Sequence, residues 1–380
     1  MGNGGAYQKT AAQAEADKRM MQDIVDGLAL RVDQLVPQCL PKAVRSGDGW
    51  YIGSIEGEPG RSMKIWRRTG IWKDYNPGHR RATGDMLHLV TYCLFADKRA
   101  DAIAWAKSEL GLDDKDPERV RMTIRAAAEA RARDFEAEQL KTRTRARDLW
   151  HGSRADPTPD TIEGTPAFSY LATRAIDLSV LGRIPRSLRY RPDVWCPVAK
   201  AKRPAMIACI MGLDGHLLGV HRTYLDIADW DHATRRGPVR NVKVEPRPGK
   251  IKSHKLTLGI YTGGCIPLWK GESRKTLREI EAGTPVFVSE GIEDGLSWAM
   301  AHPRDRVVAA VALANMGGLA LPPQAGPLTI IMQNDPDGSE AVASLEGVIQ
   351  RQQEAGRTVR LVRPPTGFKD FNDVLLGKTA

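Results

Sequence analysis

Four short apolar runs towards the C-terminal end constrain the fold more than any other feature of the sequence. They cover residues 285–288, 307–313, 328–332 and 358–362, and helical stretches at 292–301 and 339–354 lie between them. Near-continuous apolar strands that alternate with helices are typical of a parallel sheet covered by helices on both faces. The pattern predicts an α/β domain over residues 283–380.

Acidic residues follow two of these predicted strands. Glu290 and Asp294 come after the first run, and Asp335 and Asp337 come after the third. In open α/β sheets the active site lies at the carboxyl ends of the strands, and adjacent parallel strands are about 4.8 Å apart, so the two groups are expected to meet. Carboxylate oxygens suit Mg²⁺, whose other ligands are usually waters and substrate phosphates. The alternative is that these acids cap helices, but two acidic groups in successive strand–helix units favour a functional site.

The sequence predicts three segments ahead of this domain. Residues 1–112 read as a small α+β domain with short strands and an apolar helix that opens at Gly84-Asp85. Residues 113–165 combine a long charged helix, which starts at Asp116-Pro117, with a linker containing proline and glycine. Residues 166–282 mix short strands and turns, including a strand pair joined at Asp214-Gly215.

Composition limits the partners and the location that we expect. The formal net charge is +10, and residues 236–255 form a strongly basic segment broken by glycine and proline. A basic excess favours polyanionic partners through counterion release. The five cysteines form no Cys-x-x-Cys pair, so we expect free thiols and no zinc. No apolar run is long enough to cross a bilayer, and no secretory signal is visible, so we expect no membrane association and a cytosolic location.

The acidic segments resemble the Toprim signature of bacterial primases, type IA and type II topoisomerases and some nucleases. Glu290-Gly291 and Asp294 match the motif Glu-Gly-x-x-Asp after a strand. Asp335 and Gly338 match two positions of the motif Asp-x-Asp-x-x-Gly. The resemblance implies a Toprim domain, which is a Rossmann-like parallel sheet.

The second motif departs from the family at one position. Gln333 stands where its first Asp would be, and Asp337 is an additional acid. With this departure, the resemblance implies Glu290, Asp335 and Asp337 as ligands of Mg²⁺ or Mn²⁺ and Asp294 as a supporting catalytic acid. Glu290 would bind the metal or act as a general acid/base.

Segments outside the Toprim motifs resemble bacterial-type primases. Residues 203–208, 214–215 and 219–222 are similar to the strand pair that precedes Toprim in those enzymes, and residues 369–375 resemble the ending of many phage and plasmid Toprim proteins. The resemblance covers residues 166–376. It implies a mixed α+β primase-type subdomain in which Arg203 and Arg222 hold phosphates. Three lysines of the basic segment would contact the template strand or the triphosphate, namely Lys250, Lys252 and Lys255.

The N-terminal domain resembles the zinc-ribbon domain of such primases without its zinc ligands, and we interpret it as a degenerate, metal-free form. Its aromatic residues lie near basic ones in the sequence and would either stack on single-stranded bases or pack in the core. These aromatic residues are Trp50, Trp66, Trp72 and Tyr75.

The resemblance favours a DNA primase of phage or plasmid type, which would extend nucleotides on a single-stranded DNA template in a bacterial cytosol or a phage-infected cell. Its partners would be single-stranded DNA, nucleoside triphosphates and a helicase on a separate chain, since no Walker motif is present. One alternative is a Toprim nuclease, in which the same acids activate water. The other is a non-catalytic module that binds single strands and recruits a helicase, which Gln333 favours.

Overall fold

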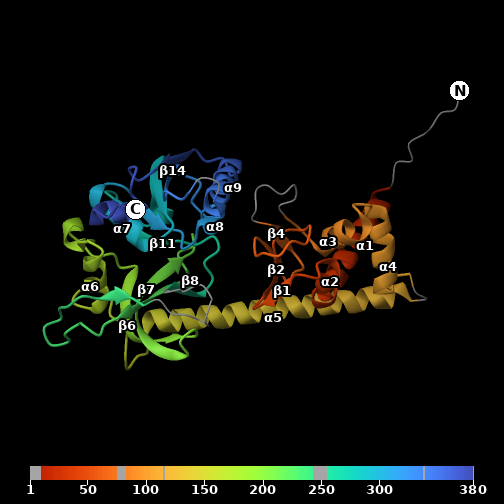
Figure 1. The fold of residues 1–380 in the computed structure, drawn as a ribbon, viewed down its shortest axis with the longest axis horizontal. Coiled ribbons are helices and arrows are strands. Elements are labelled where there is room, and N and C mark those ends of the chain that lie inside the picture. The colour runs from red at the N-terminus through yellow and green to blue at the C-terminus, as the bar shows by residue number, and fades with distance from the viewer. Residues whose placement is uncertain (1–9, 75–82, 114–115, 243–254, 337–338, 380) are drawn as a thin grey trace. The chain divides into compact units, whose positions relative to one another are not determined.

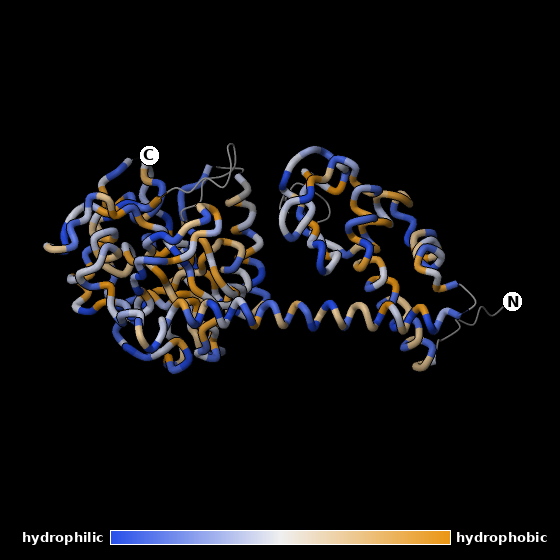
Figure 2. The backbone as a smooth tube through the Cα atoms, turned by 90° about the horizontal axis from the view of Figure 1, so that it is seen from below, coloured by the Kyte–Doolittle hydropathy of each residue, from blue (hydrophilic) through white to orange (hydrophobic). Residues whose placement is uncertain are grey.

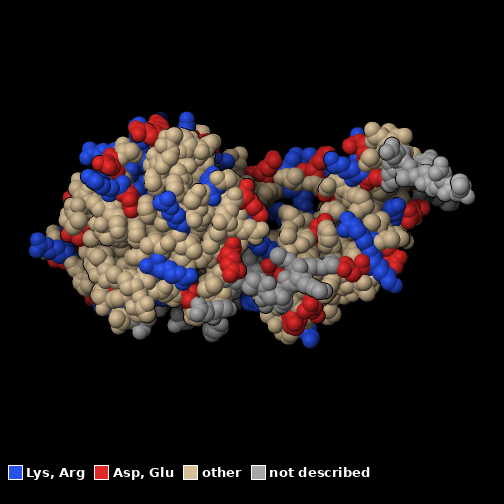
Figure 3. All heavy atoms as spheres, turned by 90° about the horizontal axis from the view of Figure 1, so that it is seen from above, with Lys and Arg blue, Asp and Glu red and all other residues tan. Residues whose placement is uncertain are grey.

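The computed structural model describes residues 10–74, 83–113, 116–242, 255–336 and 339–379 (Figure 1). The chain divides into two compact units, Met1–Ala137 and Glu138–Ala380. None of the described helices is long and apolar enough to cross a membrane. On the face drawn in Figure 3, basic and acidic side chains are interspersed over both units.

The first unit combines helices with an antiparallel sheet whose strand order is β1-β2-β3-β4-β5. The strands are β1 (Val44–Ser46), β2 (Gly49–Ile52), β3 (Met63–Trp66), β4 (Trp72–Asp74) and β5 (Thr83–Gly84). The helices are α1 (Ala11–Leu30), α2 (Val32–Cys39), α3 (Met86–Phe95) and α4 (Arg99–Leu110). Asp85 caps α3 by accepting a hydrogen bond from the His88 backbone N–H, as the sequence predicts for a helix that opens there.

Alternation along the strands places the tryptophans of this sheet in different environments. Trp72 is 1% exposed and packs in the core with Met63 and Ile65. Trp50 is half-buried, and its indole N–H donates to Asp33. Trp66 lies on the other face, where the Lys64 ammonium group is 5.1 Å from its ring centroid. Packing in the core therefore explains Trp72, whereas Trp66 stays partly accessible.

The predicted charged helix is α5 (Pro117–His151). Near its start, Ile124 joins the core of the first unit, and Arg125 makes two hydrogen bonds of 2.7 Å to the buried carboxylate of Asp23. Near its end, Ala146 and Trp150 pack against the first sheet of the second unit. Apolar side chains at its two ends explain why so polar a sequence forms an ordered helix.

The first sheet of the second unit is antiparallel, in the order β10-β8-β7-β6, and β9 pairs with β8. Its strands are β6 (Leu188–Cys196), β7 (Ala201–Met211), β8 (Leu217–Asp226), β9 (Arg240–Asn241) and β10 (Lys255–Gly259). Preceding it are α6 (Pro166–Thr173) and the 3-10 helix η1 (Leu178–Leu181). The turn at Asp214-Gly215 joins β7 to β8, which confirms the predicted strand pair.

The second sheet has the order β11-β13-β12-β14-β15. Its strands are β11 (Ile266–Trp269), β12 (Thr284–Ser289), β13 (Val307–Ala309), β14 (Ala325–Ile331) and β15 (Val359–Val362). The helices of this region are η2 (Leu277–Glu279), α7 (Ile292–Ala301), α8 (Leu313–Met316), α9 (Glu340–Glu354) and α10 (Phe371–Leu376). All neighbouring strands are parallel except β11, which runs antiparallel to β13. The predicted parallel α/β sheet is confirmed.

Strand β11 lies before residue 282 in the chain but pairs with β13, which lies after it. It comes from the segment assigned to the preceding subdomain but forms the edge of the second sheet. One hydrophobic core also joins Met206 and Ala208 of β7 to Ile292 and Leu296 of α7. Figure 2 shows the apolar residues gathered where the elements of each unit meet. The two sheets thus share a core within one compact unit.

Candidate functional site

The acids of the two motifs lie at the carboxyl ends of adjacent parallel strands. Strands β12 and β14 are paired in register, with Phe287 opposite Thr329 and Val288 opposite Ile330. Glu290 directly follows β12, and the segment with Gln333 and Asp335 follows β14. The sheet therefore brings Glu290 and Asp335 to one edge, as the sequence predicts.

Glu290 is a half-buried carboxyl group in the field of a second acid. Burial raises its pKa above the ordinary glutamate value, and the charge of Asp335 raises it further. The backbone of Leu313 forms a hydrogen bond to the carboxylate, and Lys255 and Lys369 attract it, which lowers the pKa in part. The site thus holds two interacting acids next to two cations.

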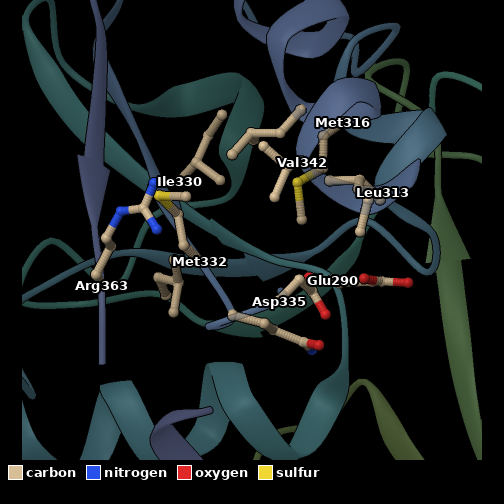
Figure 4. A pocket seen from close by; sticks show the side chains of 12 residues that line it. Glu290, Leu313, Met316, Ile330, Met332, Asp335, Val342 and Arg363 are labelled. Atoms are coloured by element: carbon tan, nitrogen blue, oxygen red, sulfur yellow. The ribbon is translucent and has the colours of Figure 1, made fainter. Parts of the chain in front are cut away.

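Two cavities meet at Glu290. The first is lined largely by apolar side chains of β14, α8 and α9, and Figure 4 shows Glu290 and Asp335 at one side of it and Arg363 at another. The second has a volume of about 180 Å³ and a more polar lining, which includes His221, Lys255 and Glu290. Gln333 lines both cavities. A small polar ligand would reach the acids through the second cavity.

Asp294, one turn along α7, is a buried acid with an incomplete set of hydrogen bonds. Its Oδ1 accepts from the backbone N–H of Phe371 at 2.8 Å, whereas its Oδ2 is buried without a hydrogen-bond partner. Burial and the nearby charge of Asp370 raise its pKa from 3.8 to about 7. The chain thus keeps a carboxyl group where ionisation is costly, which is typical of functional sites.

The C-terminal segment completes the site, which explains the motif at residues 369–375. The Asn334 side-chain amide donates to the carbonyl of Phe368, and the Asn334 backbone N–H donates to the carbonyl of Lys369. Asp370 caps α10, and the side chain of Asn372 donates to Ser297 on α7. Lys369 and Asp370 had no predicted role in the site. Both residues belong to the C-terminal motif that the sequence shows. Only the fold shows that this segment lies beside Glu290 and Asp294.

A second acid of α7, Glu293, was missed by the sequence analysis. It is buried, and its carboxylate accepts hydrogen bonds from Tyr170 Oη and Lys255 Nζ, both at 2.7 Å. Burial alone would raise its pKa, but the Lys255 ammonium group outweighs this and lowers the pKa to about 2. Glu293 is therefore ionised at neutral pH and paired with a lysine of the second cavity.

Two family models match the chain. The model described as a Toprim domain matches residues 285–380, which include Glu290, Asp294 and Asp335. Residues 285–380 form a Toprim domain. Residues 140–253 match a second model, described as a domain of unknown function (DUF7146). No curated protein matches the sequence. The prediction of a Toprim domain is thus confirmed by its fold and by this match.

Several solved primase structures resemble the chain at low identity. The primase of Aquifex aeolicus, with zinc-binding and RNA polymerase domains, is 15% identical over 93% of this chain and 82% of that chain, with a TM-score of 0.38. The primase fragment of the bacteriophage T7 primase-helicase is 15% identical over 55% and 69%, with a TM-score of 0.34. A DNA primase domain from Pseudomonas aeruginosa is 13% identical over 57% and 69%, with a TM-score of 0.37. Likeness at this level carries no conclusion about activity.

Arg222 and Arg203, which the resemblance implies hold phosphates, lie on the face of the antiparallel sheet that packs against Trp150 of α5. Arg222 pairs across the ladder with Ile207, whose side chain packs with Trp150, and the Arg222 guanidinium donates to the carbonyls of Trp195 and Thr257. Burial lowers its pKa. Arg203 precedes Ile207 by an even number of residues on β7, so its side chain leaves the sheet on the same face.

Two other residues of this sheet, His221 and Lys255, line the second cavity together with Glu290. His221 is adjacent in sequence to Arg222 and therefore lies on the other face, where it lines the second cavity with Lys255. Arg222 and Arg203 are not among the residues that line this cavity, and their contact with phosphates stays a prediction. Successive side chains of a strand point to opposite faces of the sheet, so a shift of one position moves a side chain to the other face.

The remaining predicted residues are only partly described. Lys255 lies beside Glu290, as the second cavity shows. Asp337, Lys250 and Lys252 lie outside the described residues, and so does Tyr75 of the first unit.

The donor set fits a hard divalent cation that is shared with a substrate. Glu290 and Asp335 repel each other, and Asp294 has an unpartnered buried oxygen, so positive charge at this edge relieves both. Within the described ranges, no cluster of three Asp, Glu, His or Cys side chains is arranged to hold a metal ion. Mg²⁺ is commonly held by one or two carboxylates together with substrate phosphates, which is the coordination that this site can offer.

Proposed function

We propose that this protein is a DNA primase-type nucleotidyltransferase that acts on a single-stranded DNA template with nucleoside triphosphates. One observation carries the proposal: Glu290 and Asp335 meet at the ends of adjacent parallel strands of a Toprim domain, with Lys255 in the adjoining cavity. Acids for a metal and a cation for phosphates are the groups that phosphoryl transfer needs.

In the proposed reaction, a 3′-hydroxyl group attacks the α-phosphate of the incoming nucleotide, so that a phosphodiester bond forms, the bond between the α- and β-phosphates breaks and pyrophosphate leaves. Bound Mg²⁺ or Mn²⁺, with Glu290, Asp335 and Asp337 as its ligands, would stabilise the charge that develops on the phosphate. Glu290 has a raised pKa that also suits it to take the proton of the attacking hydroxyl group. Lys255 would bind the triphosphate, and Lys250 and Lys252 would bind the template strand.

Asp294 and the partner assignments belong to the same proposal. Asp294 would support the metal-binding acids through its buried, unpartnered oxygen. A replicative helicase on a separate chain would deliver the single strand in a bacterial cytosol or a phage-infected cell. A Toprim nuclease would use the same acids on water, and the experiment below distinguishes the two reactions.

The full-length chain is incubated with single-stranded DNA, labelled nucleoside triphosphates and Mg²⁺ or Mn²⁺, and both short products and template cleavage are measured. Glu290→Gln should reduce product formation at least about 100-fold, since it removes a group at the reacting centre. Its affinity for single-stranded DNA, measured by fluorescence anisotropy, should change little. Glu281→Gln, an exposed acid of the same unit that pairs with Lys275, is the matched control.

Three results would contradict the proposal. Template cleavage without short products would identify a nuclease. Loss of DNA binding and of folding in Glu290→Gln would show that Glu290 is a structural cap. A wild-type chain that binds single strands but yields neither product would favour the non-catalytic accessory module.

A further inference from the structure

Glu293 joins three elements of the second unit through one carboxylate. Tyr170 of α6 donates to Oε1, and Lys255 of β10 donates to Oε2, each at 2.7 Å. The Glu293 side chain is 7% exposed to solvent, whereas the Lys255 side chain is 31% exposed. The buried carboxylate thus fixes the position of a lysine that a ligand can still reach.

Lys255 is fixed directly beside the acids of the Toprim domain. It lines the same cavity as Glu290 and Gln333. A Cβ atom placed on Gly291, the residue after Glu290, would lie 3.9 Å from Lys255 Nζ and 3.5 Å from Glu293 Oε2. An ammonium group with three donors suits a phosphate oxygen, and the adjacent acids suit the metal that accompanies a triphosphate.

We propose that Glu293, anchored by Tyr170, is a positioning residue that holds Lys255 in this cavity, where the lysine binds the triphosphate of an incoming nucleotide. The choice of ligand rests on the proposed function. Glu293 itself does not touch the nucleotide, because both of its oxygens are occupied and its side chain is buried. It acts through the geometry of Lys255.

The change in anion affinity on removing the Glu293 charge distinguishes two roles for this residue. If Glu293 contributed only its negative charge, Glu293→Gln would make the cavity more positive, and an anion would bind as tightly as before or more tightly. If Glu293 positions Lys255, the same substitution releases the ammonium group and weakens a charge-assisted hydrogen bond. The two roles therefore predict opposite signs for the change in affinity.

The test measures binding of Mg·ATP to the full-length chain by titration calorimetry, with a thermal melt of each variant. Glu293→Gln should weaken binding about tenfold, which is the loss of roughly one charge-assisted hydrogen bond. Tyr170→Phe removes one of the two anchors and should weaken binding by a smaller factor in the same direction. Asp160→Asn is the matched control, because it breaks a surface ion pair with Arg189 of the same unit and should leave affinity unchanged.

A double-mutant cycle tests whether Glu293 acts through Lys255. In a Lys255→Met background, Glu293→Gln should cause no further loss of affinity. Equal or tighter binding by Glu293→Gln, an additive loss in the Lys255→Met background, or no binding of Mg·ATP by the wild type would each overturn the inference. If Glu293→Gln does not fold at the assay temperature, Tyr170→Phe decides by the same criterion.

Activity data separate this inference from the proposed function. If the wild type makes no primers but affinity follows the expected pattern, the proposed polymerisation fails and the triphosphate site stands. If primers form and the KM for nucleotides in Glu293→Gln equals that of the wild type, the positioning role fails alone.

Discussion

Asp294→Asn should stabilise the protein above neutral pH, because it removes a carboxyl group that is costly to ionise. Asparagine keeps the oxygen that accepts from the Phe371 backbone N–H, and its amide group replaces the unpartnered Oδ2. In the folded state the pKa of Asp294 is raised from 3.8 to about 7. The folded state therefore holds this proton more tightly than the unfolded state does.

The sign and the pH window follow from this difference. Below about pH 4 the group is protonated in both states and costs nothing. As the pH rises from about 4 to about 7, only the unfolded state loses the proton freely, so the free energy of unfolding falls, and above pH 7 the loss is complete. A difference of about 3 pKa units corresponds to about 4 kcal/mol at most, since part of the shift comes from the nearby charges of Asp370 and Glu290.

The assay is urea denaturation of the wild type and Asp294→Asn at several pH values between 5 and 8, in EDTA to exclude metal ions. About a third of the stability difference between the two proteins should already be present at pH 5, and the difference should grow to between about 2 and 4 kcal/mol at pH 8 in favour of the variant. The transition to follow is that of the second unit, which contains α7. Asp229→Asn, at an exposed acid of the same unit, should show no such trend.

One outcome would refute the reasoning. A stability difference that does not change between pH 5 and pH 8 would show that Asp294 has an ordinary pKa in the folded protein. A separate measurement compares the stability of each protein in saturating Mg²⁺ with its stability in EDTA. If the acid is kept for a metal, Mg²⁺ should stabilise the wild type more than the variant, because a ligand stabilises only the state that binds it.

Two further predictions concern the metal and the single strand. In calorimetric titrations, Asp337→Ala should abolish Mg²⁺ binding and Gln333→Asp should change it little, because Asp337 supplies the charge that Gln333 lacks. A clear gain in Mg²⁺ affinity for Gln333→Asp would instead show that the site has lost its metal-binding function. Replacing Lys250 and Lys252 with alanine should reduce the salt dependence of single-strand binding by a slope of about 1.4, at roughly 0.7 for each phosphate contact, and an unchanged slope would show that these lysines face solvent.

Local patterns were sufficient to predict a parallel α/β sheet with acids at its strand ends, and the resemblance of the acidic motifs identified it as a Toprim domain. Apolar runs of strand length between helices predicted β12, β14, α7 and α9, because burial on both faces leaves this signature in the sequence. Glu290 and Asp335 could be placed together because the carboxyl ends of parallel strands share an edge. Asp85 and Asp116-Pro117 marked the starts of helices because capping is a local interaction.

The sequence alone did not determine which face of the antiparallel sheet meets the acids. Alternation along β8 shows that His221 and Arg222 point in opposite directions, but not which of them lies over the Toprim domain. That choice depends on which elements cover each face, and α5 covers the side of Arg222. Likewise, Tyr170, Lys255 and Glu293 are far apart in the chain, and no local pattern links them. Only the tertiary structure brings them together, since α6 and α7 share one core and β10 pairs with β8 in the adjoining sheet, and the pairing of a buried charge is decided by such contacts.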